Sequence, residues 1–210
     1  MPLGDSITAS PCVAQLLSQK LKSNQLSNFV FVGGSLNNQS CGGAPNVMTE
    51  GHGGYLVTDL VGTGQHASEL VPWCTSDKGE IVLMHFGTND AWNSRTTESI
   101  LTAFATVLSE LRAVNPSVIV FVAQIIPLNP ANCATCESNV ESLNAAIPGW
   151  VQSHSTATSP LYVVDIHGAF TAATYLPKST YTDDGVHPNP AGSQLIADRW
   201  YEALRAHGLP

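Results

Sequence analysis

The stretch IVLMHFGTND, from Ile81 to Asp90, joins a nearly continuous apolar run to a polar turn. A run this apolar is typical of a β-strand covered on both faces, as in a parallel sheet flanked by helices. The polar residues Gly87–Asp90 follow directly, at the carboxyl end of that strand. Because sites in such sheets form outside the carboxyl ends of the strands, the stretch indicates both a fold class and the place of a site.

Similar apolar runs recur along the chain and alternate with helical patterns. Strands are expected at Met1–Leu3, Asn28–Val32, Ile81–Phe86, Val118–Gln124 and Leu161–Asp165. Apolar residues at helical spacing predict helices over Val13–Leu26, Glu98–Val114, about Ser138–Gln152 with a break or kink near Pro148–Gly149, and from about Pro190 onward. This alternation predicts one α/β domain with a parallel sheet and helices on both of its faces.

Composition restricts the classes of partner. The 210 residues carry a net charge of −8, with only eight Lys plus Arg and 11% charged residues in all. A chain this poor in basic residues lacks the positive surface that binds nucleic acids or anionic membranes, so we expect neither partner. The longest apolar run, Val118–Ala123, is far shorter than the roughly 20 residues that span a bilayer.

Low charge is common in secreted proteins, and the sequon Asn38–Ser40 agrees with secretion. Only Met1–Leu3 stand ahead of the first polar turn. We therefore expect that a leader, and part of the first strand, are missing from this sequence.

Five cysteines allow a topological argument. Cys133 and Cys136 form a lone C-x-x-C, which favours a small structural disulfide over a zinc site or a redox-active pair. Cys12 begins the helix after the first polar turn and Cys41 follows a strand end, so both belong near one rim. Cys74 belongs to the opposite edge. We expect the bonds Cys12–Cys41 and Cys133–Cys136, a free Cys74 and an oxidising compartment outside the cell.

Polar clusters also stand at other predicted strand ends. Gly4–Ser6 follows the first strand, and Thr49–Tyr55 ends the loop after the second. A further cluster, Thr182–Asn189, precedes the last helix. Because the carboxyl ends of parallel strands meet at one rim, we expect the first two clusters to lie beside Gly87–Asp90.

Within these clusters, Ser6, Asp184 and His187 suit nucleophilic catalysis. A serine hydroxyl is a poor nucleophile unless a base takes its proton and a partner fixes the tautomer of that base. Asp184 stands three residues before His187, so the two can meet within one turn. The oxyanion of acyl transfer needs donors, and the candidates are the Ser6 N–H, an N–H of Gly53–Gly54 and the Asn89 amide.

These motifs resemble the SGNH, or GDSL, hydrolase superfamily. GDSIT (Gly4–Thr8), a glycine in EGHGGY (Glu50–Tyr55), GTND (Gly87–Asp90) and DGVHP (Asp184–Pro188) occur in the order and rough spacing of its four blocks. One block is weak evidence, but four in order across almost the entire chain are highly specific. The resemblance implies an SGNH hydrolase fold, which is a flavodoxin-like three-layer α/β/α sandwich with a five-stranded parallel sheet. We expect residues 1–210 to form this single domain.

Position by position, the resemblance makes Ser6 the nucleophile, with His187 as base and Asp184 as its acidic partner. It makes Ser6, Gly54 and Asn89 the oxyanion donors. It implies ester hydrolysis without a metal ion or an organic cofactor. Within the superfamily, the motifs MPLGDSIT (Met1–Thr8) and EGHGGY (Glu50–Tyr55) look most like those of carbohydrate esterase family 3, the acetyl xylan esterases. Members of that family remove acetyl groups from xylan.

The expected function is a secreted, monomeric serine esterase that removes short acyl groups, acetyl above all, from xylan or a related polysaccharide. Trp92, Tyr55 and His52 are candidate substrate contacts. Gly53 stands where that carbohydrate esterase group commonly has a serine, which leaves the exact sugar open. The alternatives are a lipase or thioesterase of the same fold that acts on longer acyl chains, and a non-catalytic carbohydrate-binding protein.

Three other polar residues have structural interpretations. Asp5 and Asp90 are expected to cap turns or helices. His85 lies within a predicted strand and is expected in the core with its hydrogen bonds satisfied.

Overall fold

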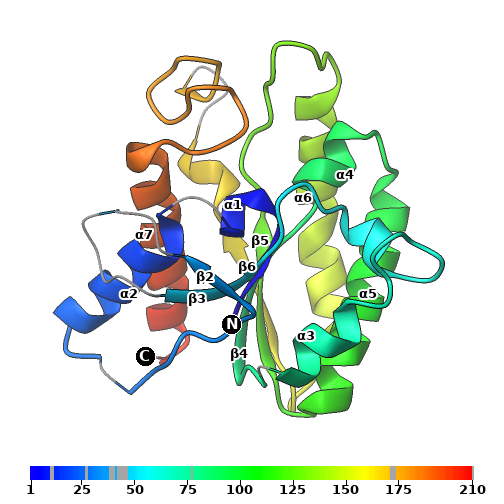
Figure 1. Ribbon diagram of the computed structural model, residues 1–210, viewed down its shortest axis with the longest axis vertical. Helices are drawn as coiled ribbons and strands as arrows, with labels where there is room; N and C mark the ends of the chain where they lie inside the picture. The colour runs from blue at the N-terminus through cyan, green and yellow to red at the C-terminus, as the bar shows by residue number, and fades with distance from the viewer. Residues whose placement is uncertain are drawn as a thin grey trace.

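A sheet of six strands lies between two layers of helices in the computed structural model (Figure 1). The structure describes residues 1–9, 12–26, 28–37, 41, 47–76, 78–170 and 174–209. The strands are β1 (Pro2–Gly4), β2 (Ser35–Asn37), β3 (Val47–Gly51), β4 (Ile81–His85), β5 (Ile119–Gln124) and β6 (Leu161–Asp165). Their order is β2-β3-β1-β4-β5-β6, and β2 alone among them runs antiparallel to its neighbour. The sheet therefore has the expected number of parallel strands, with one antiparallel edge strand added.

Helices cover both faces of this sheet (Figure 1). On one face lie α2 (Val13–Ser23) and α7 (Pro190–Ala206); on the other lie α3 (Leu70–Ser76), α5 (Thr97–Val114) and α6 (Cys136–His154). In β4, Val82 and Met84 join the core on one face while Leu83 joins the core on the other. Because successive strand residues point to opposite faces, a strand covered on both faces is mostly apolar, which explains the run from Ile81.

The register of the sheet sets the position of the site. Gly4 on β1 pairs with Gly51 on β3 and with His85 on β4. The loops that follow these three strands therefore begin side by side, at the carboxyl edge of the sheet.

The expected strand Asn28–Val32 is wrong, because this segment lies outside the sheet. Its apolar pattern comes from packing, since Phe29 and Phe31 lie against the core on the α2 and α7 side. The place beside β1 belongs to β3, whose end had been expected as a loop because it contains the polar pair Thr49 and Glu50. Both of these side chains are buried.

The expected break in the fourth helix is also wrong, because α6 continues through Pro148. Proline lacks the N–H that would bond to the carbonyl four residues earlier, which belongs to Asn144. That carbonyl instead accepts a hydrogen bond from Gln124 Nε2 at 2.8 Å. The side chain at the end of β5 thus satisfies the acceptor that the proline leaves open.

Two disulfide bonds are present, Cys12–Cys41 and Cys133–Cys136. Cys74 is unbonded and buried. This is the pairing expected from the topology, although Cys74 lies within α3 rather than after a helix.

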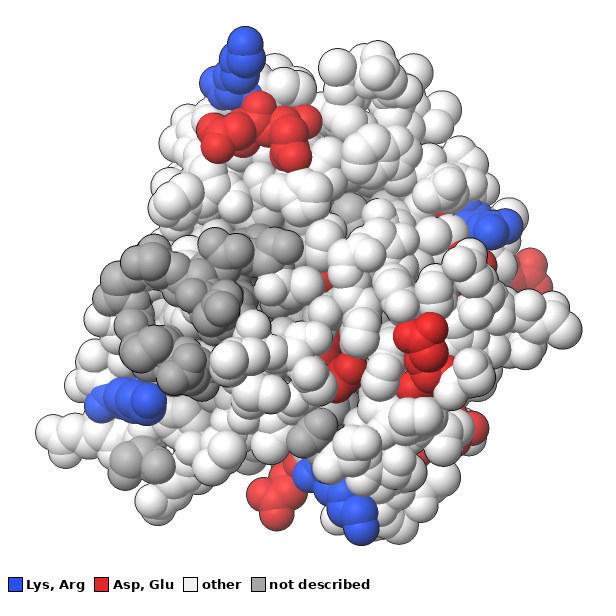
Figure 2. All heavy atoms as spheres, viewed as in Figure 1, with Lys and Arg blue, Asp and Glu red and all other residues white. Residues whose placement is uncertain are grey.

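Charged side chains are sparse on the face of the molecule shown in Figure 2. No helix among the described residues is long and apolar enough to cross a membrane. In the same residues, no group of three or more His, Cys, Asp or Glu is placed to hold a metal ion. The sequon Asn38–Ser40 falls outside the described residues.

His85 lies in the core as expected, but its ring is not satisfied. The residue is 2% exposed, and neither ring nitrogen hydrogen-bonds another residue in the described part of the chain. Burial lowers the pKa of this imidazole from 6.5 to about 4. The folded protein therefore resists protonation of a group that the unfolded chain protonates readily.

Replacing His85 with leucine is expected to reduce the loss of stability in acid. Because the folded pKa is depressed, the contribution of this histidine is fully present above pH 6.5 and is lost as the pH falls through 6.5 towards 4. Between neutral pH and pH 4, this histidine is expected to cost the wild type about 3 kcal/mol in the free energy of unfolding, a loss that the leucine variant avoids. Urea unfolding at pH 7.5 and pH 4.5 measures it. Equal losses in the wild type and in His85→Leu would contradict the prediction.

Candidate active site

Ser6 stands at the sharp turn between β1 and α1 (Ser6–Ala9). The turn requires glycine at position 4, because a Cβ there would collide with Thr8 Oγ1 and with the carbonyl oxygen of His85. Close packing of the turn against β4 leaves the serine at the carboxyl edge of the sheet, with the loops after β3 and β4 beside it.

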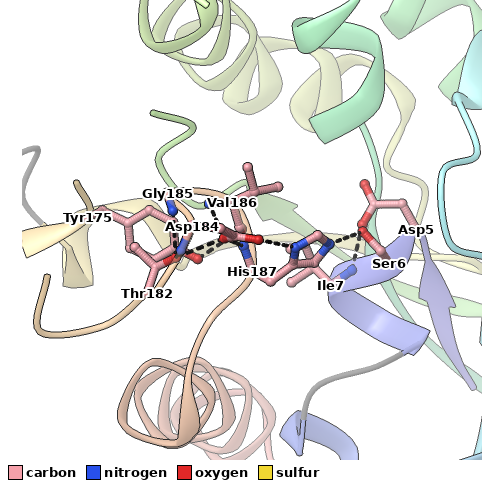
Figure 3. A network of polar contacts seen from close by, with 9 residues as sticks. All are labelled: Asp5, Ser6, Ile7, Tyr175, Thr182, Asp184, Gly185, Val186 and His187. Atoms are coloured by element: carbon pink, nitrogen blue, oxygen red, sulfur yellow. Dashed lines mark hydrogen bonds and ion pairs between the residues drawn. The ribbon is translucent and has the colours of Figure 1, made fainter. Parts of the chain in front are cut away.

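The structure brings Ser6, His187 and Asp184 into one line (Figure 3). His187 Nε2 lies 3.0 Å from Ser6 Oγ, and His187 Nδ1 lies 2.8 Å from Asp184 Oδ2. The other carboxylate oxygen, Asp184 Oδ1, accepts the backbone N–H groups of Val186 at 2.8 Å and His187 at 2.7 Å. In this arrangement the imidazole can take the hydroxyl proton while the carboxylate holds its other nitrogen protonated.

Hydrogen bonds stabilise the ionised form of the Asp184 carboxyl. Burial opposes the ionised form, but hydrogen bonds from the His187 ring and from the His187 and Val186 backbone outweigh it and lower the pKa of this carboxyl to about 2. The carboxylate is therefore an anion near neutral pH and can stabilise an imidazolium beside it. The group remains open to solvent, since the side chains of Asp184 and His187 are 52% and 44% exposed.

The predicted oxyanion donors Gly54 and Asn89 belong to the segments that follow β3 and β4, whose ends pair with the end of β1. A Cβ on Gly53 would lie 3.9 Å from Ser6 Cβ, so the loop after β3 passes next to the nucleophile. Gly54 has a φ of +83°, a left-handed conformation that favours glycine. Asn89, in α4 (Thr88–Trp92), donates one amide N–H to the carbonyl oxygen of Tyr55 at 3.0 Å. A side-chain amide has two N–H groups, so one remains for another acceptor.

The candidate substrate contacts occupy two different settings. His52 and Tyr55 pack into an aromatic cluster, in which the His52 ring stacks on Trp73 and the Tyr55 ring stacks on His66. Trp92 ends α4 and is 40% exposed. It lies three residues after Asn89, with an apolar surface open to solvent.

Two buried carboxylates near the site cap backbone N–H groups as expected, whereas sequence reasoning missed the role of a third, Glu50. Asp5 Oδ1 accepts the backbone N–H of Ile7 at 3.0 Å, in the turn that carries Ser6. Asp90 accepts the first two backbone N–H groups of η1 (Val57–Leu60), and so ties this segment to α4. Glu50 accepts a hydrogen bond from the ring of His52. Asp5 is fully buried, and burial raises its pKa to about 6. The GTND motif contained a signal for Asp90, but Glu50 stood in a polar stretch that looked solvated.

The chain resembles known proteins along nearly its whole length. A model of the GDSL-like lipase/acylhydrolase family matches residues 3–195. Similar solved structures include a serine-to-alanine mutant of an acetyl esterase with an acetate ion, 32% identical, with a TM-score of 0.83 over 99% of this chain and 96% of that chain. A carbohydrate esterase family 3 protein from Talaromyces cellulolyticus is 33% identical, with a TM-score of 0.82 over 99% of this chain and 96% of that one.

A family 3 carbohydrate esterase from Clostridium thermocellum is more distant. It is 24% identical, with a TM-score of 0.76 over 99% of this chain and 94% of that one, which supports the fold alone. No curated protein sequence matches the chain.

Proposed function

The chain belongs to the GDSL-like lipase/acylhydrolase family and within it to carbohydrate esterase family 3, and on that premise we propose that it removes acetyl groups from a polysaccharide such as xylan. It is a carboxylic ester hydrolase. The observation that carries the proposal is the line of hydrogen bonds from Asp184 through His187 to Ser6.

In the proposed reaction, His187 Nε2 takes the proton of Ser6 as Oγ attacks the acetyl carbonyl carbon. The carbonyl oxygen becomes an oxyanion, which the N–H groups of Ser6 and Gly54 and the amide of Asn89 stabilise. The imidazolium then gives its proton to the leaving sugar oxygen, and an acetyl-enzyme remains. Water loses a proton to His187 and attacks the carbonyl carbon of this ester. The bond between that carbon and Ser6 Oγ then breaks, which releases acetate, and the imidazolium returns its proton to Oγ.

Two observations favour acetyl groups on a polymer over long acyl chains. The acetyl esterase that aligns with 96% of its length carries an acetate ion in its structure. In the present structure, Asp184 and His187 are about half exposed and Gly53 and Gly54 are exposed, so the site is open to the surface. An open site admits a polysaccharide chain, whereas a lipase or thioesterase needs a longer apolar channel for its acyl group.

Acyl chain length tests this proposal directly. We expect kcat/KM for p-nitrophenyl esters to be highest for acetate and to fall by at least about tenfold at octanoate. We also expect acetate release from acetylated xylan. Preference for octanoate would favour a lipase or thioesterase, and no hydrolysis of any acetylated substrate would favour a carbohydrate-binding protein.

We further propose that the enzyme acts outside the cell as a monomer. The Cys12–Cys41 and Cys133–Cys136 bonds support an oxidising compartment, because disulfides persist there. Light scattering of the purified protein reports the oligomeric state.

A further inference from the structure

The loop from His52 to Tyr55, which contains Gly53 and Gly54, is held at both ends by carboxylates outside the triad. At its first end, His52 Nε2 lies 2.5 Å from Glu50 Oε1. The His52 ring also stacks on Trp73, with 3.8 Å between ring centroids and 9° between planes. Glu50 is buried, and its other oxygen, Oε2, accepts the Gly34 N–H, so the carboxylate that binds this end of the loop is itself held in place.

At the other end, Tyr55 is bound through its side chain. Its hydroxyl donates to Glu69 Oε2 at 3.0 Å, and His66 Nδ1 lies 2.8 Å from Glu69 Oε1. The rings of Tyr55 and His66 stack with 3.9 Å between their centroids. The pKa of the Glu69 carboxyl is lowered, chiefly by its hydrogen bond with His66, so the group accepts both bonds as an anion.

Tyr55 connects this contact to the candidate oxyanion hole. Its carbonyl oxygen accepts the hydrogen bond from Asn89 Nδ2 at 3.0 Å, and it directly follows Gly54 in the chain. One residue thus fixes the orientation of a side-chain donor and the end of the loop that carries a backbone donor. Gly53 and Gly54 are exposed and lack side chains, so the loop has little packing of its own.

Electrostatic stabilisation of an oxyanion depends on donors that are in place before charge develops. A donor that must be ordered during the reaction loses much of its effect, and small displacements of reacting groups are costly. A flexible glycine pair therefore needs support from its flanking residues, and the carboxylates supply it.

We propose that Glu69 is a positioning residue of the esterase, which keeps the Gly54 and Asn89 donors in place by holding Tyr55. The inference rests on the proposed function, since it assigns Gly54 and Asn89 to oxyanion stabilisation. Glu69 is well suited to a test because its side chain is 38% exposed. Its removal leaves no buried charge, whereas removal of the buried Glu50 would leave the Gly34 N–H without its acceptor.

Glu69→Ala is expected to lower kcat for acetyl ester hydrolysis roughly tenfold, with KM changed less than about twofold. Tyr55→Phe removes only the hydroxyl and is expected to give a similar loss. Glu69→Gln keeps one oxygen that can accept from Tyr55, so it should restore part of kcat. Glu98→Ala, in the exposed first turn of α5, is the matched control and should match the wild type.

A double-mutant cycle separates positioning from a general loss of structure. Asn89→Ala alone is expected to lower kcat about 10²–10³-fold. If Glu69 acts through Tyr55 on Asn89, Glu69→Ala costs less in the Asn89→Ala background than in the wild type. Equal costs in both backgrounds, or a wild-type kcat in Glu69→Ala, would overturn the proposal.

Amide hydrogen exchange gives a readout that is independent of activity. Exchange in the peptide that contains residues 52–55 is expected to be faster in Glu69→Ala than in the wild type or Glu98→Ala. Unchanged exchange would refute the positioning role of Glu69, even if the wild type hydrolyses acetyl esters. Conversely, faster exchange in a protein that hydrolyses no ester would show that Glu69 holds this loop and would refute the proposed function.

Discussion

Alanine in place of Ser6 is expected to lower kcat for acetyl ester hydrolysis by about 10⁴–10⁶-fold. Ser6 Oγ is the atom that attacks the carbonyl carbon in the proposed mechanism. Neither the Asp184 carboxylate nor the His187 ring takes its place as the group that forms the acyl-enzyme. The substitution removes one oxygen from a partly exposed side chain, so we expect the fold and the KM to change little. Acetate release from acetylated xylan and initial rates with p-nitrophenyl acetate measure the loss.

The matched control is Ser142→Ala, on the exposed side of α6. It removes a similar hydroxyl from a helix and should leave kcat unchanged. A fluorophosphonate that labels active serines should add its mass to a Ser6 peptide in the wild type and in Ser142→Ala, but not in Ser6→Ala. Residual activity of Ser6→Ala within tenfold of the wild type would refute the nucleophile assignment.

The strands β4, β5 and β6 were predictable because their sequences are nearly continuous in apolar residues, as expected for strands that helices cover on both faces. The run Ile81–Phe86 predicted β4, and the next two runs predicted β5 and β6. Apolar side chains predominate where both sides of a strand pack against helices, so the signal is strong over a short length.

The strand β3 was not predictable in the same way. Thr49 and Glu50 made its sequence look like a polar loop, yet both are buried. Glu50 is accommodated because Gly34 N–H and His52 bond its carboxylate. Partners that come from other segments cannot be read from a local pattern. The apolar Asn28–Val32 misled for the opposite reason, since Phe29 and Phe31 pack against the core from outside the sheet and Val30 is 82% exposed.

The candidate site shows the same contrast between residues that stand in local motifs and residues that act through contacts with distant segments. Ser6, Asn89, Asp184 and His187 stand in short motifs whose order and spacing carry information, and the structure brings Ser6, Asp184 and His187 together. Glu69 stands in no such motif. It bonds Tyr55 across the intervening η1 segment, 14 residues further along the chain, and such a contact has no signature in the sequence.

Asparagine in place of Asp184 is expected to lower kcat by about 10³–10⁴-fold with little change in structure. Asp184 Oδ1 accepts the Val186 and His187 backbone N–H groups, while Oδ2 faces His187 Nδ1. An asparagine can keep the first set of bonds through its oxygen, which leaves its NH₂ group facing the ring. A donor at that place favours the tautomer protonated on Nε2, and that nitrogen can no longer accept the proton of Ser6.

The neighbouring carboxylate provides the control for this change. Asp183→Asn makes the same chemical substitution one residue away, at an exposed position, and is expected to keep a wild-type kcat. Both variants should have the same thermal midpoint near pH 7 within a few degrees, because the backbone bonds of the loop survive. A loss in Asp184→Asn smaller than tenfold would show that His187 does not depend on this carboxylate for its tautomer. An equal loss in Asp183→Asn would show that the charge of the loop, rather than the bond to Nδ1, is what the reaction requires.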